Sequence, residues 1–295
     1  MERMQFGLVV CLLMLLGQIA GAETGWQKAG SPDVTPGEGA AAERARLPHV
    51  IRDGGNYKMW FEGYWGLEEI LYARSSDGKK WETYAHCSPV VPRTREEFLV
   101  GSPSVIKDEN GIYHMWYSYC TTGYGGDGTN HIAYARSVDG RDWERYAGNP
   151  IISQGDMPTT LGGVTVVKRN GRFHLWATGN GIAYATSEDG LDWKPHGKIS
   201  FDEKQQGWIH GAGVTVYEGK FVLAFPVRVD DSNEIRFASS TDGKNWKAGY
   251  LPSLDGASGP SPLLRVGDRW MLWCKFPSAE NNKFAIWRAC YTSED

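Results

Sequence analysis

One short segment, which we call the box, occurs four times in the chain with the same order of strand, turn and tryptophan. Its copies are residues 70–81 (ILYARSSDGKKW), 132–143 (IAYARSVDGRDW), 182–193 (IAYATSEDGLDW) and 235–246 (IRFASSTDGKNW). Alternating apolar and polar residues at the start of each copy predict a β-strand. The Ser-x-Asp-Gly sequence that follows is typical of a tight turn, because Ser and Asp bond their own backbone and Gly accepts a positive φ. A pattern that recurs in this way predicts a repeat architecture.

Two further strands precede each copy. The nearer strand carries large apolar residues, at Met59-Trp60, Met115-Trp116, Leu175-Trp176, Leu223-Ala224 and, in a fifth repeat, Met271-Leu272-Trp273. The farther strand ends in a polar or glycine turn, over residues 50–55, 105–111, 164–171, 214–219 and 263–267. With the strand that begins at the box tryptophan, each repeat is a four-stranded antiparallel meander. Such units repeated radially form a β-propeller.

The spacing of the repeats indicates how the ring closes. Successive box tryptophans lie 50 to 62 residues apart, and the fifth repeat runs off the C-terminus after its third strand. Trp26 opens the sequence WQKAGSPDV, which resembles WERYAGNPI at Trp143. We therefore expect an all-β, five-bladed propeller over residues 23–295, with the N-terminal strand completing the last blade. This closure leaves no open sheet edge.

The N-terminus has the layout of a secretory signal peptide. A basic Arg3, an apolar run over residues 6–16 and the small residues Ala20-Gly21-Ala22 predict cleavage after residue 22. The apolar run is too short to span a bilayer. We expect a secreted or periplasmic monomer without a membrane segment after cleavage. The net charge of −4 does not indicate the excess of basic residues that is typical of proteins that bind nucleic acids, so we expect no nucleic-acid partner.

The cysteines do not decide whether a disulfide forms, and they indicate no cofactor. Cys87, Cys120, Cys274 and Cys290 remain after signal cleavage, and Cys274 and Cys290 flank one predicted hairpin. A bond between them requires a Cα separation that sequence does not fix. No C-x-x-C pair suggests zinc, and the box aspartates lack the ligand spacing of a dedicated calcium loop, although a structural calcium could bind there.

The meander places its short, polar turns on one face of the disc and its longer loops on the other. The longer loops carry most of the aromatic and ionisable variety, which suits sugars, since sugar C–H surfaces stack on rings while hydroxyls bond polar groups. The candidate ligand-binding residues there are Arg46, His49, Trp65, His131, Trp208 and His210. Trp65 and Trp208 fall outside the repeat template, so each could stack on sugar or pack in the fold. The other repeated tryptophans, and the box Ser and Asp residues, are interpreted as structural.

The repeats of the form G-x-Y-x-M-W-Y followed by I-x-Y-A-x-S-x-D-G-x-x-W resemble the five-bladed propellers of glycoside hydrolase families 43 and 32. The resemblance covers residues 23–295. It implies three inward carboxylates near the start of first strands, with an inverting pair about 6.5–9.5 Å apart. In this sequence Leu47 stands before Pro48 where the families carry Asp, and His210 stands where a Glu is expected. The third blade begins Leu161-Gly162-Gly163 and offers no carboxylate.

Two main hypotheses follow. In the first, loop carboxylates hydrolyse glycosidic bonds in plant- or algal-type poly- or oligosaccharides, with His49 or His210 assisting proton transfer. The candidate catalytic carboxylates are Glu62, Glu97, Asp202 and Asp255. Glu62 stands out because equivalent positions carry Ser118, Thr178 and Pro226. In the second hypothesis the propeller binds carbohydrate without turnover, as a lectin does. A structural or protein-interaction propeller is a third reading.

Overall fold

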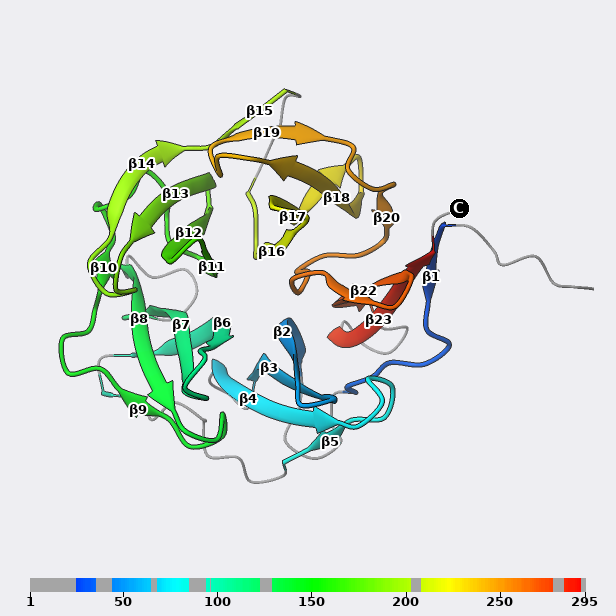
Figure 1. Ribbon diagram of the computed structural model, residues 1–295, viewed down its shortest axis with the longest axis horizontal. Helices are drawn as coiled ribbons and strands as arrows, with labels where there is room; N and C mark the ends of the chain where they lie inside the picture. Colours follow the sequence, from blue (N-terminus) through cyan, green and yellow to red (C-terminus); the bar gives the residue numbers. More distant parts are fainter. Residues whose placement is uncertain are drawn as a thin grey trace, which may run out of the picture.

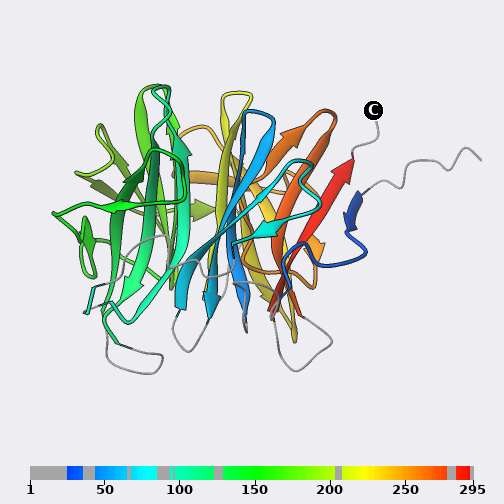
Figure 2. The same ribbon diagram turned by 90° about the horizontal axis from the view of Figure 1, so that it is seen from below.

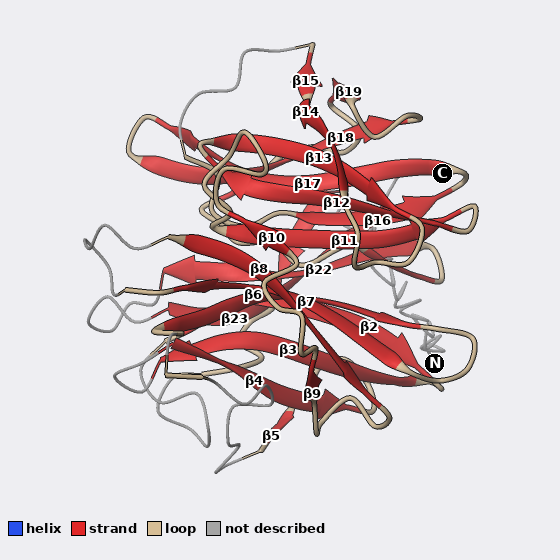
Figure 3. Cartoon of the chain, turned by 90° about the vertical axis from the view of Figure 1, so that its left-hand side faces the viewer, coloured by secondary structure: helices blue, strands red, loops and turns tan. Residues whose placement is uncertain are grey.

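The computed structural model describes residues 25–35, 44–64, 68–84, 94–95, 97–122, 129–202, 208–277 and 284–292. Five sheets stand around a common axis, and β2, β6, β11 and β16 lie nearest the centre (Figure 1). All the regular elements in the described ranges are strands (Figure 3). The predicted all-β, five-bladed propeller is therefore confirmed.

Each blade contains four main strands, and in the first four blades these pair in sequence order. The first blade consists of β2 (Ala45–Asp53), β3 (Asn56–Tyr64), β4 (Glu68–Ser75) and β5 (Glu82–Thr83). The second consists of β6 (Leu99–Lys107), β7 (Tyr113–Cys120), β8 (Asn130–Ser137) and β9 (Glu144–Arg145), with β10 (Ile152–Ser153) added on β8. The third consists of β11 (Gly163–Arg169), β12 (Arg172–Gly179), β13 (Gly181–Ser187) and β14 (Lys194–Lys198).

The last two blades follow the same plan. The fourth consists of β16 (Gly213–Tyr217), β17 (Lys220–Val229), β18 (Ser232–Ser240) and β19 (Asn245–Ala248), with β15 (Ser200–Phe201) and β20 (Leu254–Asp255) added. The fifth consists of β21 (Leu264–Val266), β22 (Arg269–Pro277), β23 (Phe284–Thr292) and β1 (Gly25–Lys28). Pairing is antiparallel throughout, except that β15 runs parallel to β19.

The N-terminal strand closes the ring as predicted. β1 pairs antiparallel with β23, and Trp26 stands opposite Tyr291. The Trp26 indole stacks on Phe237 with ring centroids 5.1 Å apart, and its Nε1 donates to the carbonyl of Pro252 at 2.8 Å. The first described residues thus join blade 5 and also contact blade 4. The strand pairing fixes β1 to β23, and the Trp26 contacts fix it to blade 4.

Buried tryptophans join neighbouring blades. Trp60, Trp116 and Trp176 are fully buried on the second strands of blades 1 to 3. Each donates its indole N–H to a glycine carbonyl in the turn of the next blade at 2.8 Å, over the pairs Trp60–Gly140, Trp116–Gly190 and Trp176–Gly243. Burying both the ring and its polar N–H needs such a partner. The interpretation of these tryptophans as packing residues is confirmed.

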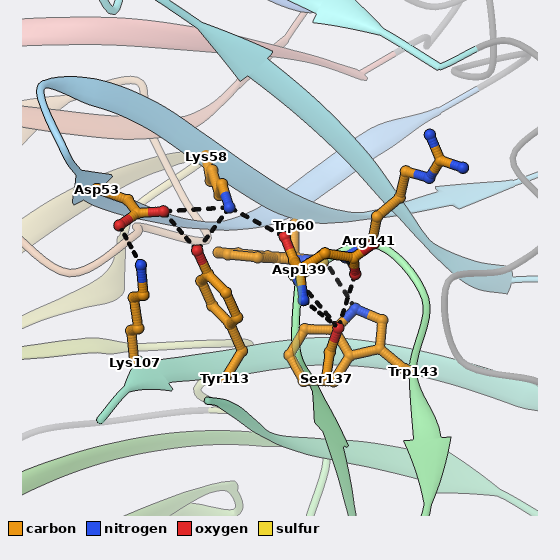
Figure 4. Close-up of polar contacts among 10 residues, drawn as sticks. Asp53, Lys58, Trp60, Lys107, Tyr113, Ser137, Asp139, Arg141 and Trp143 are labelled. Atoms are coloured by element: carbon orange, nitrogen blue, oxygen red, sulfur yellow. Dashed lines mark hydrogen bonds and ion pairs between the residues drawn. The ribbon is translucent and has the colours of Figure 1, made fainter. Parts of the chain in front are cut away.

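The Ser-x-Asp-Gly turns supply those carbonyls. In the second blade, Ser137 Oγ accepts the backbone N–H of Gly140 at 2.9 Å. Asp139 Oδ1 accepts the backbone N–H groups of Arg141 and Asp142 at 2.8 and 2.9 Å. Figure 4 shows this turn, and the other three copies make the same bonds. The repeated Ser and Asp residues therefore hold the turn that receives the tryptophan.

A carboxylate replaces the glycine carbonyl where the ring closes. Asp33 Oδ2 accepts the indole N–H of Trp273 at 2.8 Å and that of Trp81 at 3.2 Å. Arg288 pairs with Asp33 at 3.3 Å and donates to the carbonyl of Gly78 at 2.8 Å. Burial outweighs the nearby guanidinium and raises the pKa of Asp33 to about 6. The seam between blades 5 and 1 is therefore held by an ionisable group.

The disulfide considered for Cys274 and Cys290 does not form. Both side chains are free thiols, as is Cys120. In the β22–β23 ladder Cys274 stands opposite Trp287, and Cys290 stands opposite Met271. The two cysteines thus lie on neighbouring strands, offset by three residue pairs of the ladder. This offset separates their Cα atoms by more than a disulfide can span. Cys87 lies outside the described residues.

The proposed signal peptide, residues 1–22, also lies outside the described residues. Within the described part of the chain, no helix has the length and apolar character to cross a membrane.

Candidate functional site

The two faces of the disc differ in their connections. The hairpins that join first to second strands form the upper face in Figure 2, with the box turns, and we call this the turn face. The ends of β3, β7 and β12 and the starts of β2, β6 and β11 lie on the opposite face, which we call the mouth face. Arg46, Glu62, His210 and Lys275 all belong to this face.

Residues with positive φ stand at the entrance to the first strand of every blade. They are Leu47, Ser102, Leu161, Gly211 and Gly259. A leucine in this conformation is unfavourable by about 1–2 kcal/mol, so the surrounding structure must hold it. The buried Leu47 side chain extends across the axis, and a Cβ on Gly211 or Gly259 would lie only 2.5 or 2.9 Å from its Cδ2. Where the resembling families carry Asp, this protein has an apolar plug.

A cavity of about 300 Å³ opens beside this plug, between blades 4, 5 and 1. We call it the mouth cavity. Its lining consists of Arg46, Leu47, Trp208, His210, Pro226, Val227, Arg228, Asn233, Ser258, Gly259 and Lys275. Trp208 is 56% exposed and lies above Gly162, where a Cβ would be 3.5 Å from the indole. Within the described lining, the charged side chains are cationic and none is a carboxylate.

Arg46 forms a clamp with two buried glutamates behind the cavity. Its guanidinium pairs with Glu62 through Nε and with Glu68 through a terminal nitrogen. Glu62 and Arg46 are direct cross-strand partners on β3 and β2. The Glu62 carboxylate also fills the space that a side chain at Gly101 would need. Glu62 is therefore at the mouth, as predicted, but its carboxylate is engaged by Arg46.

Lys275 occupies in blade 5 the position that Glu62 occupies in blade 1, two residues after the second-strand tryptophan. Burial, followed by the positive charge of Arg46, lowers the pKa of Lys275 to about 8; Glu62 opposes this change, and Arg44 makes a smaller contribution to it. Its Nζ lies 4.0 Å from the centre of the Phe284 ring. In the part of the chain that the structure describes, Lys275 has no ion-pair partner.

His210 faces the same group of charges. Burial is the main cause that lowers the pKa of His210, and Arg46 and Lys275 act in the same direction. Glu62 opposes them. The imidazole is therefore neutral near pH 7, where it can accept as well as donate a hydrogen bond.

Glu97 lies away from the mouth cavity. Its buried carboxylate receives two bonds from Arg145 at 2.5 and 2.6 Å, and Oε2 also accepts the backbone N–H of Thr94 at 2.9 Å. This arrangement connects the entry of β6 to the outer strand β9 of the same blade. It is the geometry of a structural ion pair.

Asp202 and Asp255 lie elsewhere again. Asp202 follows β15 at the outer edge of blade 4, where its Oδ1 accepts the backbone N–H of Ala248 at 2.9 Å. Asp255 is exposed on β20, opposite Glu234 of β18. The four candidate catalytic carboxylates therefore do not meet in one cavity.

The two remaining candidate histidines do not line the mouth cavity. His49 is buried, and desolvation lowers its pKa to about 4 while a backbone bond to Val105 opposes this. It borders a narrow crevice on the propeller axis. His131 stacks on Tyr119 at 5.0 Å and contacts the Thr129 hydroxyl at 3.0 Å. Trp65 lies outside the described residues.

The structure thus brings Arg46, Trp208 and His210 together, with Glu62 behind them. Sequence reasoning missed Lys275 and Glu68. Lys275 could have been found by extending the repeat alignment into the fifth copy, where the lysine follows Trp273 by two residues. Glu68 carries no such signal, because its role comes from the ion pair with Arg46. No group of metal-ligating side chains occurs among the described residues.

Sequence relatives match part of the chain. No family model matches the chain. Two uncharacterised proteins of Mycobacterium tuberculosis, from strains CDC 1551 / Oshkosh and ATCC 25618 / H37Rv, are 33% identical to it over 106 residues. The match covers 33% of this chain and 33% of each relative, so the chain spans about a third of the length of these relatives.

Solved structures match over most of the chain. A glycoside hydrolase superposes with a TM-score of 0.69 at 14% identity and covers 90% of this chain and 94% of its own. An exo-1,5-alpha-L-arabinanase from a bovine ruminal metagenomic library gives 0.63 at 14%, covering 86% and 94%. The Bombyx mori family 32 beta-fructofuranosidase gives 0.64 at 14%, covering 87% and 61%. The chain therefore shares the five-bladed fold of propeller glycoside hydrolases.

Proposed function

We propose that the protein binds carbohydrate and that the mouth cavity is the binding site. The observation that carries this proposal is the half-exposed indole of Trp208 at the edge of a concavity that also presents His210 and Asn233. A sugar needs an apolar face to stack on and several hydrogen-bonding groups around it. The cavity volume of about 300 Å³ is at the lower end for small-molecule sites and fits one sugar ring.

A calorimetric screen of mono- and oligosaccharides tests this site. For a sugar that binds the wild type, Trp208→Ala is expected to lower the affinity by about tenfold or more, since a stacking partner contributes about 1–2 kcal/mol. Tyr146→Ala is the matched control, because Tyr146 is an exposed aromatic residue on blade 2 (42% exposed). Equal affinities in wild type and Trp208→Ala would contradict the proposed site.

Hydrolysis of a glycosidic bond is the second candidate function. It is favoured by the fold shared with glycoside hydrolases and by Glu62 beside the mouth cavity. An inverting reaction needs two carboxyl groups about 6.5–9.5 Å apart with a water between them. Because Glu62, Glu97, Asp202 and Asp255 do not converge, the geometry of the described residues supports binding better than turnover.

An activity assay separates the two functions. Purified protein is incubated with aryl glycosides and with the oligosaccharides that bind, and released sugar is measured. Release by the wild type that is lost in Glu62→Gln would establish hydrolysis with Glu62 in the site. Binding without release on every substrate would assign the protein to the carbohydrate-binding class.

Export and a monomeric state are parts of the same proposal. Export is supported by the signal-peptide layout of residues 1–22. Mass spectrometry of protein recovered from the expressing cells is expected to show a chain that begins after Ala22. A full-length chain retained in the cytoplasm would contradict export.

A further inference from the structure

The mouth face carries a ring of five equivalent positions on the second strands. The ring consists of Glu62, Ser118, Thr178, Pro226 and Lys275. Each stands at the mouth end of its strand, two residues beyond the buried aromatic or alanine of the repeat. Because the five side chains differ, the fold does not require any one of them. The lysine in this ring therefore needs another explanation.

The surroundings of Lys275 are unfavourable for an ammonium. The side chain is half-buried, and both Arg46 and Arg44 act on it as like charges. The carboxylate that acts on Lys275 in the opposite sense, Glu62, is already bound to Arg46. Removing an ammonium from water without a partner is unfavourable by several kcal/mol in general. The position is one that a bound anion would stabilise.

Two arginines also line the cavity. Arg228 stands on the blade 4 side, on β17, with its guanidinium 3.8 Å from Asp231, and Arg46 stands on the blade 1 side, paired with Glu62 and Glu68. Ser258, the cross-strand neighbour of Lys275, adds a hydroxyl. Among the described lining residues there is no carboxylate to repel an anion. A cavity whose lysine has no ion-pair partner among the described residues, with an exposed indole at its edge, combines an oxyanion site with a stacking surface.

We propose that the mouth cavity selects an acidic sugar, whose oxyanion is bound by Lys275 while its ring lies against Trp208. This inference rests on the proposed carbohydrate-binding function and specifies its ligand class. The oxyanion could belong to the sugar itself, as in a uronic acid, or to free inorganic phosphate or sulfate. Both sources share the negatively charged oxygens that the ammonium of Lys275 binds.

Calorimetry on matched sugar pairs tests the inference. Galacturonic acid is compared with galactose, and glucuronic acid with glucose, at low ionic strength. The acidic member is expected to bind about ten- to a hundredfold more tightly, because hydrogen bonds to charged groups are stronger than those between neutral groups. Added salt should reduce this advantage by screening.

Variants of Lys275 assign the effect to one side chain. Lys275→Met is expected to abolish the preference for the acidic sugar over the matching neutral sugar. Lys275→Arg should retain most of the preference. Lys247→Met is the matched control, because Lys247 is exposed on the outer strand β19 and should change neither affinity. Unchanged thermal unfolding of each variant shows that the fold is intact.

The outcomes separate this inference from the proposed function. Equal binding of acidic and neutral sugars, with Trp208 required for both, would overturn the acidic-sugar inference and leave the carbohydrate site standing. Absence of binding to any sugar would overturn both. Inorganic phosphate or sulfate that binds as tightly as the uronic acid, in a manner that depends on Lys275, would support the oxyanion site but overturn its assignment to a sugar.

Discussion

The turn face repeats one set of side chains in four blades, whereas the mouth face carries a different set in each blade. On the turn face, every box serine and aspartate satisfies the same backbone N–H groups. On the mouth face, the equivalent second-strand positions range from Glu62 to Lys275. The difference teaches that the positions that repeat are determined by the fold, and that those that vary are available for ligand recognition.

Lysines on the two faces show the same contrast. On the turn face, Lys58 and Lys107 both pair with Asp53, at 3.1 and 2.7 Å, and a bond with Tyr113 completes the cluster (Figure 4). These bonds hold the pKa of Asp53 well below its usual range. On the mouth face, Lys275 has no such carboxylate among the described residues. The charges around Asp53 are therefore balanced internally, whereas the charge of Lys275 has no counter-charge among the described residues.

The largest expected effect lies in a repeated seam. Trp116→Ala removes a fully buried indole and leaves the Gly190 carbonyl without its donor. We expect the free energy of unfolding to fall by about 3–5 kcal/mol, measured by chemical denaturation. Trp208→Ala on the mouth face should change stability by less than about 0.5 kcal/mol. Similar losses in the two variants would break the comparison between the faces.

The closing seam should depend on pH where the other seams do not. The pKa of Asp33 is about 6 in the folded protein, above its ordinary value, so its stabilising contribution is complete below about pH 4 and is lost as the pH rises through 6. A shift of about two units corresponds to roughly 3 kcal/mol. Relative to Asp33→Asn, the wild type should therefore become less stable between pH 4 and pH 7.

Denaturation of both proteins at a series of pH values measures this difference. Comparison with Asp33→Asn cancels the titration of the other carboxylates. A difference between the two proteins that stays constant from pH 4 to pH 7 would contradict the assignment of an ionisable group to the closing seam.

A single box aspartate should have a smaller effect. Asp189→Ala removes the acceptor of two backbone N–H groups in the turn of the third blade. We expect a loss of about 1–2 kcal/mol, with no change in sugar affinity. Thermal unfolding and calorimetry on the same sample check both parts, and reduced sugar affinity at full stability would show that the turn face takes part in binding.

The smallest expected effect on stability comes from Lys275. Because this ammonium is half-buried without an ion pair in the described structure, Lys275→Met should leave the free energy of unfolding unchanged or raise it by up to about 1 kcal/mol. Lys58→Met should instead lower it by about 1 kcal/mol, since Asp53 loses one of its partners. Destabilisation by Lys275→Met equal to that of Lys58→Met would mean that Lys275 has a structural role.

The fold could be predicted because its determinants are local and repeated. The box turn, the second-strand tryptophan and the strand alternation each recur, so their spacing alone indicated the blade count and the pairing of Trp26 with the last blade. The turn and mouth faces also followed from the meander. Asp33 escaped prediction, because its bonds to Trp81 and Trp273 join segments that are far apart in the sequence.

The site was predictable only in part. Arg46, Trp208 and His210 were expected near the mouth and lie in one cavity. Glu97, however, is bound by Arg145, and Asp202 bonds the backbone of Ala248. Loop position shows on which face a charge lies, but the partner that neutralises it depends on side-chain geometry. For the same reason, the apolar plug formed by Leu47 could be noticed as a departure from the family pattern but not placed across the axis.

The most direct test of the account is a crystal structure of the protein soaked with the sugar that binds it most tightly. The account predicts electron density for the sugar in the mouth cavity, with the ring against Trp208 and an oxyanion within hydrogen-bond distance of Lys275 Nζ. Density on the turn face or at the outer edge of a blade, with the mouth cavity holding only water, would contradict it.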